Sequence, residues 1–142
     1  MEMSKIELKD ITLDYTDQGN VYHALDGVTF SVEEGEFVSL IGSSGCGKST
    51  TLSILAGLNN PKNGSFLIDG QETRGTGKDR GVVFQHYSLF PWMSVRKNIE
   101  FGIKQNFPKL SKKELTAKAM EYLEKVGLKG FENKYPYQLS GG

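Results

Sequence analysis

The sequence lacks several features that mark secreted and membrane proteins. Its single cysteine, Cys46, cannot form an internal disulfide, as suits a reducing compartment. No apolar run approaches the ~20 residues that a membrane-spanning helix requires, and the N-terminus lacks the basic-then-apolar layout of a signal peptide. We therefore expect a cytoplasmic chain that contacts a membrane only through another protein.

Charge of either sign is not in excess. Lysine and arginine together number 17, as do aspartate and glutamate, so the formal net charge is zero. A nucleic-acid-binding surface usually shows a basic excess, and this balance argues against nucleic acid as a partner. The 142 residues are enough for one domain with a core of its own.

Glycine, by contrast, is abundant and gathers in one informative stretch. Residues 42–49 read GSSGCGKS and match the phosphate-loop pattern G-x-x-x-x-G-K-[ST]. A short apolar run, Phe37–Ile41, precedes this loop and predicts a buried strand. Apolar residues at helical spacing follow from Leu52 to Ala56, and Gly57 stands where a helix would stop. This order of elements favours nucleotide binding over a glycine-rich turn that matches by chance.

These residue types suit the binding of a nucleotide's phosphates. Glycines let the backbone wrap around an anion with its N–H groups turned inward, and the helix that follows directs its positive dipole end to the same place. Lys48 can reach the β- and γ-phosphates of ATP, and the hydroxyl of Ser49 can ligate Mg²⁺. We expect the phosphate contacts to come from Gly42, Ser43, Ser44, Gly45, Cys46, Gly47, Lys48, Ser49 and Thr50.

The remaining pattern is rich in strands first and in helices last. Apolar runs predict four further strands, over residues 6–15, 28–32, 65–68 and 81–84. A change of phase near Lys9 and Asp10 indicates a bulge in the first of them. Ser94 can cap a helix that ends near residue 105, and a capping box at Ser111–Glu114 opens a second helix that ends at Gly127.

Four stretches together resemble the ATP-binding subunit of an ABC transporter. They occur in the family's order and read HALDGVTFSVEEGEFVSLIG before the phosphate loop, then DRGVVFQ, LFPWMSVRKNI and finally LSGG at residues 139–142. The phosphate loop alone indicates a phosphate-loop NTPase, and LSGG after a helical segment singles out the ABC class. GVVFQ followed by LFPW is similar to the nitrate/sulfonate/taurine importer group.

The resemblance implies an α/β fold. It consists of a phosphate-loop NTPase core with an N-terminal antiparallel β subdomain and a C-terminal helical subdomain. We expect the antiparallel region in residues 1–36 and 64–80, and the core with its Q-loop in 37–63 and 81–93. The helical subdomain is expected in 94–142.

The resemblance also implies roles for single residues. Tyr15 corresponds to the aromatic residue that stacks on adenine. Two alternatives stay open: Tyr15 is an ordinary strand tyrosine, or Tyr22, which lies in the same loop region, is the stacking residue. Gln85 corresponds to the glutamine that contacts Mg²⁺ and the attacking water and senses the γ-phosphate, alongside catalytic Lys48. The signature motif grips the γ-phosphate held by the opposite subunit, and it begins here with Ser140, Gly141 and Gly142.

Partners follow from the same resemblance. Residues His86–Met93 resemble the stretch that meets the coupling helix of a transmembrane permease subunit. Within it, an apolar group serves either core packing or docking, and consists of Leu89, Phe90, Pro91 and Trp92. The intact family implies a homodimer that holds two ATP molecules, attached to the inner face of the membrane through the permease. A separate solute-binding protein delivers the solute.

The sequence departs from the family pattern at its end. The family continues with an apolar strand ending in Asp-Glu, which holds Mg²⁺ and polarises water, and then with a switch histidine, whereas this sequence stops at Gly142. A missing general base typically costs ~10²–10⁴ in rate, so we expect weak ATP binding and little or no hydrolysis. We also expect an open apolar sheet edge beside the phosphate-loop strand.

The sequence therefore predicts an energy-coupling ATPase subunit, or an N-terminal fragment of one, for import of nitrate/sulfonate/taurine-like solutes. The alternatives are a non-catalytic nucleotide-binding or assembly module and an ABC ATPase without a transport role. His23 and His86 lack nearby carboxylates or cysteines at ligand spacing, which favours surface positions over metal ligation. Cys46 is either a reactive thiol or a small filler between glycines.

Overall fold

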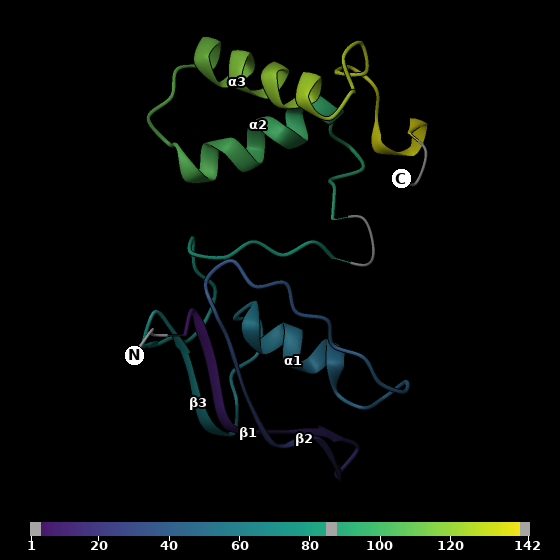
Figure 1. Cartoon of the computed structure of the whole chain (residues 1–142). Helices are drawn as coiled ribbons and strands as arrows, with labels where there is room; N and C mark the ends of the chain where they lie inside the picture. Colours follow the sequence, from purple (N-terminus) through teal and green to yellow (C-terminus); the bar gives the residue numbers. More distant parts are fainter. Residues whose placement is uncertain (1–3, 85–87, 140–142) are drawn as a thin grey trace. The chain divides into compact units, whose positions relative to one another are not determined.

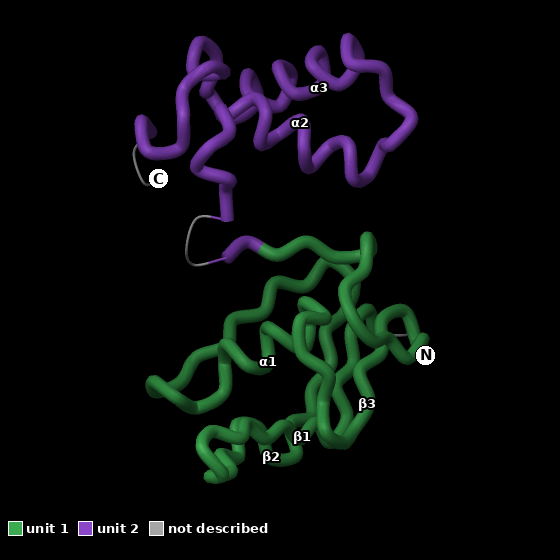
Figure 2. The backbone as a smooth tube through the Cα atoms, turned by 180° about the vertical axis from the view of Figure 1, so that it is seen from behind, with its two compact units in different colours: residues 1–82 green, residues 83–142 purple. Residues whose placement is uncertain are grey.

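The computed structural model describes residues 4–84 and 88–139. It separates into two compact units, Met1–Val82 and Val83–Gly142, which Figure 2 distinguishes by colour. Within the residues that the structure describes, the first unit contains all the strands and one short helix, and the second contains the remaining helices. The expected order, strands first and helices last, is confirmed.

Unit 1 is built on a four-stranded antiparallel sheet (Figure 1). Its strands are β1 (Ile6–Asp17), β2 (Asn20–Val32), β3 (Asn63–Ile68) and β4 (Gln71–Glu72). The order across the sheet is β2-β1-β3-β4, so β1 pairs with the strand that follows it and with one that lies beyond the phosphate loop. This long-range pairing joins the chain before the phosphate loop to the chain after it.

The first two strands form a hairpin with a bulge. The register between β1 and β2 shifts between Leu8 and Ile11, and Asp10 in this gap has a φ of 50°. Its N–H donates to the hydroxyl of Thr29 at 2.9 Å, which satisfies a group that the bulge removes from the ladder. The bulge expected near Lys9 and Asp10 is confirmed.

The core of unit 1 lies between this sheet and helix α1 (Lys48–Leu55). Ile54 is the buried apolar residue of the helix and joins a cluster with strand residues Leu8, Ile11, Leu13, Leu25, Phe66 and Ile68. Burial of a side chain of this kind is worth about 1.5–3 kcal/mol. Because α1 begins at Lys48, this core fixes the phosphate loop against the hairpin.

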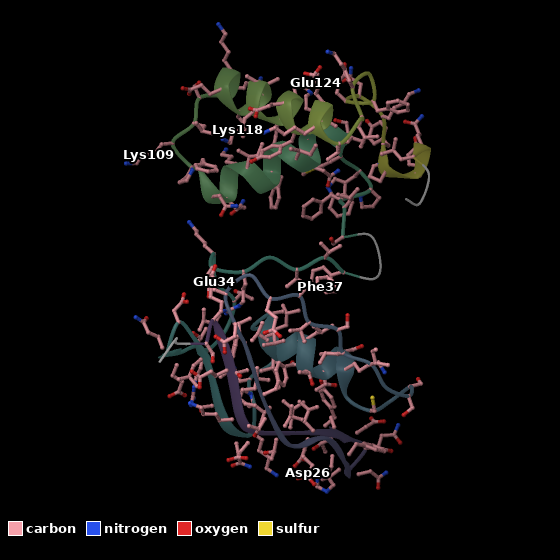
Figure 3. The ribbon with its side chains drawn as sticks, in the orientation of Figure 1. Asp26, Glu34, Phe37, Lys109, Lys118 and Glu124 are labelled. Carbon is pink, nitrogen blue, oxygen red and sulfur yellow. The ribbon has the colours of Figure 1, made fainter. Side chains whose placement is uncertain are left out.

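Two expected strands are not formed. Residues 37–41 and 81–84 have no strand assignment, and among the described residues no sheet partner reaches them. Phe37, labelled in Figure 3, is 92% exposed, Ile41 is 94% exposed and Val83 is 99% exposed. The prediction of buried strands here was wrong because an apolar run becomes a buried strand only when neighbouring strands pair with it. The edge expected beside a phosphate-loop strand is instead an exposed apolar segment.

Unit 2 is a helical hairpin. Helices α2 (Val95–Asn106) and α3 (Lys112–Lys125) lie side by side in Figure 1, and a short 3-10 turn, η1 (Pro136–Gln138), follows. Its buried apolar residues include Ala119 and Leu123 of α3. None of the helices in the described ranges has the length and apolar character needed to cross a bilayer.

Both helix starts in unit 2 are confirmed. The side chain of Ser94 accepts a hydrogen bond from the N–H of Lys97, and Ser111 forms a reciprocal capping box with Glu114. The Ser111 hydroxyl donates to the Glu114 carboxylate at 2.6 Å, and this bond together with one from the Ser111 N–H holds the pKa of Glu114 below its ordinary value. Gly127 follows α3 with a φ of 72°, as expected of a helix stop.

Candidate nucleotide site

Lys48 is held against the start of its own loop. Its ammonium donates to the carbonyl oxygen of Gly42 at 2.8 Å and to that of Ser43 at 2.6 Å, and lies 3.5 Å from the sulfur of Cys46. These contacts bring both ends of the phosphate-loop pattern together around one cation. The loop is exposed from Gly42 to Cys46, so an anion can reach it from solvent.

The N-terminus of α1 is open for an anion. Gly47 precedes the helix with a left-handed conformation, and no side chain caps the first turn. The first backbone N–H groups of a helix have no intrahelical partner, and the helix dipole is positive there. The first turn of α1 also contains no acidic residue that would repel an anion. The uncapped start of α1 and the Lys48 ammonium thus lie at the same exposed loop.

Glycine is required at position 47 for two reasons. Its φ of 93° lies in the left-handed region, and a Cβ there would stand 2.6 Å from the Leu25 side chain and 2.8 Å from the Ala24 carbonyl oxygen. Gly42 is also crowded, because a Cβ there would meet the Cys46 sulfur at 2.6 Å. The glycines of the pattern therefore let the loop pass close to β2 and close upon itself.

Ser49 and Thr50 follow Lys48 in the first turn of α1. Ser49 is exposed, whereas Thr50 is partly buried and its carbonyl accepts a hydrogen bond from the Ser53 hydroxyl at 2.7 Å. Mg²⁺ prefers hard oxygen ligands and usually keeps several waters and substrate phosphates in its shell. An exposed hydroxyl beside the phosphate loop fits that preference, and Ser49 is the residue that would hold the ion.

Tyr15 and Tyr22 are both beside the turn of the β1–β2 hairpin. They are directly opposite each other in the antiparallel register, which places their side chains on the same face. Tyr15 is 43% exposed and Tyr22 is 55% exposed. Tyr15 differs in that its hydroxyl accepts a hydrogen bond from the side-chain amide of Asn59 at 2.9 Å. Both aromatic candidates for adenine stacking are therefore accessible, and one of them is tied to the region after α1.

An ion-pair cluster adjoins Tyr15. The Asp14 carboxylate lies 2.6 Å from the Lys62 ammonium and 2.7 Å from Nδ1 of His23. The Lys62 contact, followed by that with His23, holds the pKa of Asp14 below its ordinary value. The His23 side chain thus pairs with Asp14 across the β1–β2 hairpin. The described residues contain no group of three or more histidine, cysteine or acidic side chains able to hold a metal.

Part of the expected site lies outside the described residues. Gln85, His86, Ser140, Gly141 and Gly142 belong to this part. Their expected roles stay predictions.

Leu89–Met93 is described and contains an aromatic cluster. The ring of Phe90 lies 5.4 Å from that of Trp92 and 4.9 Å from that of Phe101 in α2. Phe90 is partly buried, whereas Leu89, Pro91 and Trp92 are exposed. The apolar group thus divides between packing against α2 and display to solvent.

The sequence analysis did not identify two asparagines that fix parts of these sites, Asn98 at the loop before α2 and Asn59 beside Tyr15. Asn98 accepts from the N–H of Phe90 at 2.8 Å and donates to the carbonyl oxygens of Phe90 and Met93 at 3.1 Å, which fixes the loop before α2. Asn59 joins Tyr15 to the end of α1. Neither belongs to a motif, and their partners are visible only once the chain is folded.

Comparisons with known proteins find relatives that cover most of this chain. Residues 25–142 match the family model described as ABC transporter. Nitrate import ATP-binding protein NrtD of Synechocystis sp. is 47% identical over 137 residues, which are 96% of this chain and 51% of that protein. Taurine import ATP-binding protein TauB of Pelagibacter ubique is 42% identical over 127 residues, which are 89% of this chain and 47% of that protein.

A solved structure shares the fold. It is the dimeric post-hydrolysis state of the ATP-binding cassette MJ0796 bound to ADP and Pi, with a TM-score of 0.82, 34% identity, and coverage of 96% of this chain and 63% of that one. The expected fold class is confirmed by this likeness. The chain spans about half the length of the curated relatives it matches. On the family match over residues 25–142 and these relatives, the chain belongs to the ABC transporter family.

Proposed function

We propose that this chain binds MgATP through residues 42–50 as part of the energy-coupling subunit of an importer. The observation that carries the proposal is the position of Lys48, whose ammonium lies at the phosphate loop beside the uncapped start of α1. Its present acceptors are neutral carbonyl oxygens. A phosphate oxygen carries a negative charge, so its bond with the same ammonium would pair two opposite charges and be stronger.

The chain's own residues act chiefly by position and charge. The loop N–H groups and Lys48 hold the β- and γ-phosphates, and they oppose the negative charge that the γ-phosphoryl group spreads over its oxygens during transfer. When bound, Mg²⁺ would supply further neutralisation of phosphate charge, with Ser49 and Gln85 as its protein ligands. Gln85 senses the γ-phosphate and orients water, and Ser140, Gly141 and Gly142 contact the nucleotide of an opposing subunit. Tyr15 stacks on the adenine.

The partners belong to the same proposal. A second copy of the subunit completes each nucleotide site, and the dimeric state of the MJ0796 cassette supports this arrangement. A permease docks near residues 86–93, where Trp92 is exposed beside Phe90. The subunit then works at the cytoplasmic face of the membrane. The nitrate and taurine relatives support a small anionic or sulfonate-bearing solute, which a binding protein and the permease select.

We expect the chain's regions to divide this work. The adenine base is contacted by the antiparallel region, residues 1–36 and 64–80. The phosphates are bound by the core, residues 37–63 and 81–93, which includes the Q-loop. The signature motif belongs to the helical subdomain, residues 94–142.

The test measures MgATP affinity and ATP turnover on the same sample of the chain. Binding with turnover above a Lys48→Ala control supports an energy-coupling ATPase. Binding without turnover agrees with the little or no hydrolysis expected of this chain, and it also fits the non-catalytic nucleotide-binding module. Absence of MgATP binding contradicts both. Co-purification of a membrane protein with the chain separates an importer from an ABC ATPase without a transport role.

A further inference from the structure

The turn after α1 is fastened to the strand that bears Tyr15. The side-chain amide of Asn59 donates to the Tyr15 hydroxyl at 2.9 Å and to the hydroxyl of Ser53 in α1 at 2.9 Å. One residue therefore connects the candidate base platform to the helix that begins at the phosphate loop. Tyr15 and Asn59 are 44 positions apart in the sequence, so the contact depends on the fold.

Hydrogen bonds to Ser53 of α1 hold Asn59 in place. The backbone N–H of Asn59 donates to the carbonyl oxygen of Ser53 at 3.2 Å, and the N–H of Leu58 donates to the same oxygen at 2.9 Å. The Ser53 hydroxyl in turn donates to the carbonyl oxygen of Thr50 at 2.7 Å. Thr50 lies next to Ser49 in the first turn of α1. A chain of hydrogen bonds thus runs from the Tyr15 hydroxyl to the phosphate end of the helix.

Further contacts hold the same turn against β1. The backbone N–H of Lys62 donates to the carbonyl oxygen of Thr12 at 2.7 Å, and the side chain of Asn63 donates to the Thr12 hydroxyl at 2.8 Å. The Lys62 ammonium contacts the Asp14 carboxylate at 2.6 Å. These bonds restrain β1 as a whole, whereas Asn59 alone of these residues contacts the hydroxyl of Tyr15.

We propose that Asn59 is a positioning residue for recognition of the nucleoside. It sets the distance between the Tyr15 ring and the phosphate loop, so that a base and its triphosphate are bound together rather than the phosphates alone. This inference rests on the proposed binding of MgATP. The inference also favours Tyr15 over Tyr22 as the residue that stacks on the base. Within the described residues the hydroxyl of Tyr22 makes no hydrogen bond, so its ring is not restrained in this way.

The experiment compares two ligands by titration calorimetry on the full 142-residue chain. MgATP needs both the base platform and the phosphate loop, whereas magnesium tripolyphosphate needs only the loop. We expect Asn59→Ala to weaken MgATP binding about three- to tenfold, the range of one hydrogen bond, and to change tripolyphosphate binding less than about twofold. The matched control is Asn60→Ala in the same turn, whose exposed side chain makes no hydrogen bond to a described residue.

A second pair of variants tests whether Asn59 acts through Tyr15. Tyr15→Phe keeps the ring but removes the acceptor, so it should cause the same loss for MgATP, and the double variant should lose no more than either single one. Tyr22→Phe should leave both ligands unaffected.

The possible outcomes separate the two proposals. If the unaltered chain fails to bind MgATP, the proposed function is wrong and this inference with it. If the chain binds MgATP but Asn59→Ala changes neither affinity, or weakens both ligands equally, Asn59 has no positioning role. A loss in Tyr22→Phe without one in Tyr15→Phe would overturn the choice of tyrosine. Thermal unfolding of each variant identifies any loss that comes from unfolding, which would likewise count against a positioning role.

Discussion

The α2–α3 hairpin buries its apolar side chains, whereas residues 37–41, the segment that leads into the phosphate loop, expose theirs. In the hairpin, Ala119 and Leu123 are fully buried, whereas charged side chains such as Lys104 and Lys125 are exposed. In the leading segment, Phe37 and Ile41 are almost fully exposed although the run is as apolar as a core strand. The two regions therefore differ in where their packing partners come from.

The hairpin obtains its partners from nearby sequence. Its helices are adjacent in the chain, their caps are local, and each satisfies its own backbone hydrogen bonds. A β-strand cannot do this, because its N–H and C=O groups are paired only by another strand. Residues 37–41 lie outside the sheet of the described residues, so their apolar side chains have no layer to join. The comparison shows that apolar character alone does not create a strand.

The largest effect should come from the buried side of the hairpin. Leu123→Ala removes methyl groups from a fully buried position and should lower the free energy of unfolding by about 2–5 kcal/mol. Val126→Ala, at an exposed position beyond the same helix, should change it by less than about 0.5 kcal/mol. Urea unfolding followed by far-UV circular dichroism measures both. Equal effects would mean that the hairpin lacks the core described above.

A smaller effect is expected at the start of α1. Gly47→Ala places a Cβ against Leu25 and the Ala24 carbonyl oxygen at a φ of 93°, which should cost about 1–3 kcal/mol of unfolding free energy and weaken MgATP binding. The control is Gly35→Ala, which has a similar φ of 76° but no atom within 4 Å of the new Cβ. Thermal unfolding and nucleotide titration of both variants separate crowding from strain. A larger loss in Gly35→Ala would contradict the close approach of the loop to β2.

The hairpin of unit 1 should weaken in acid. Because the folded pKa of Asp14 lies below its unfolded value of about 3.9, its contribution to stability is present above that value and disappears as the pH falls through the folded pKa. Asp14→Asn should therefore lower the unfolding midpoint at neutral pH and reduce its fall between about pH 5 and pH 2. Thermal unfolding across this range is the measurement. Parallel curves for both proteins would show that the contacts of Asp14 with Lys62 and His23 do not contribute.

The smallest effect should come from the exposed segment. Phe37→Ser and Ile41→Ser should each change the unfolding free energy by less than about 0.5 kcal/mol, because neither side chain is packed. Both should raise solubility, since exposed apolar runs promote association. Ile11→Ser, at a fully buried position in β1, serves as the destabilised control. A strong destabilisation by either segment variant would show that the segment is packed in solution.

Features that depend on neighbouring residues were predictable from the sequence. Ser94 and Ser111 marked helix starts, Gly127 marked a helix end, and the bulge at Asp10 followed from a change of phase. Each of these signals acts within a few residues of the position that it determines. The helix after the phosphate-loop pattern was predictable for the same reason, whereas the function of the loop as a nucleotide site stays a prediction.

Features that depend on distant residues were not predictable. The run Phe37–Ile41 is as apolar as a core strand, but its sequence does not tell whether another strand will pair with it. The bond from Asn59 to Tyr15 joins two residues that belong to no common motif. Sequence reasoning proposed Tyr15 with Tyr22 as its rival, and the bond from Asn59 is a difference between them that appears only in the folded hairpin.

The affinity of the chain for MgATP with and without the Lys48 ammonium tests the central claim most directly. Because Lys48 supplies a charged hydrogen bond to the phosphates, Lys48→Ala should weaken MgATP binding about 10- to 100-fold. Lys78→Ala, which removes an exposed ammonium from a loop of the same unit, should leave the affinity within about twofold. An unchanged affinity in Lys48→Ala would contradict the assignment of this loop as the site that holds the nucleotide.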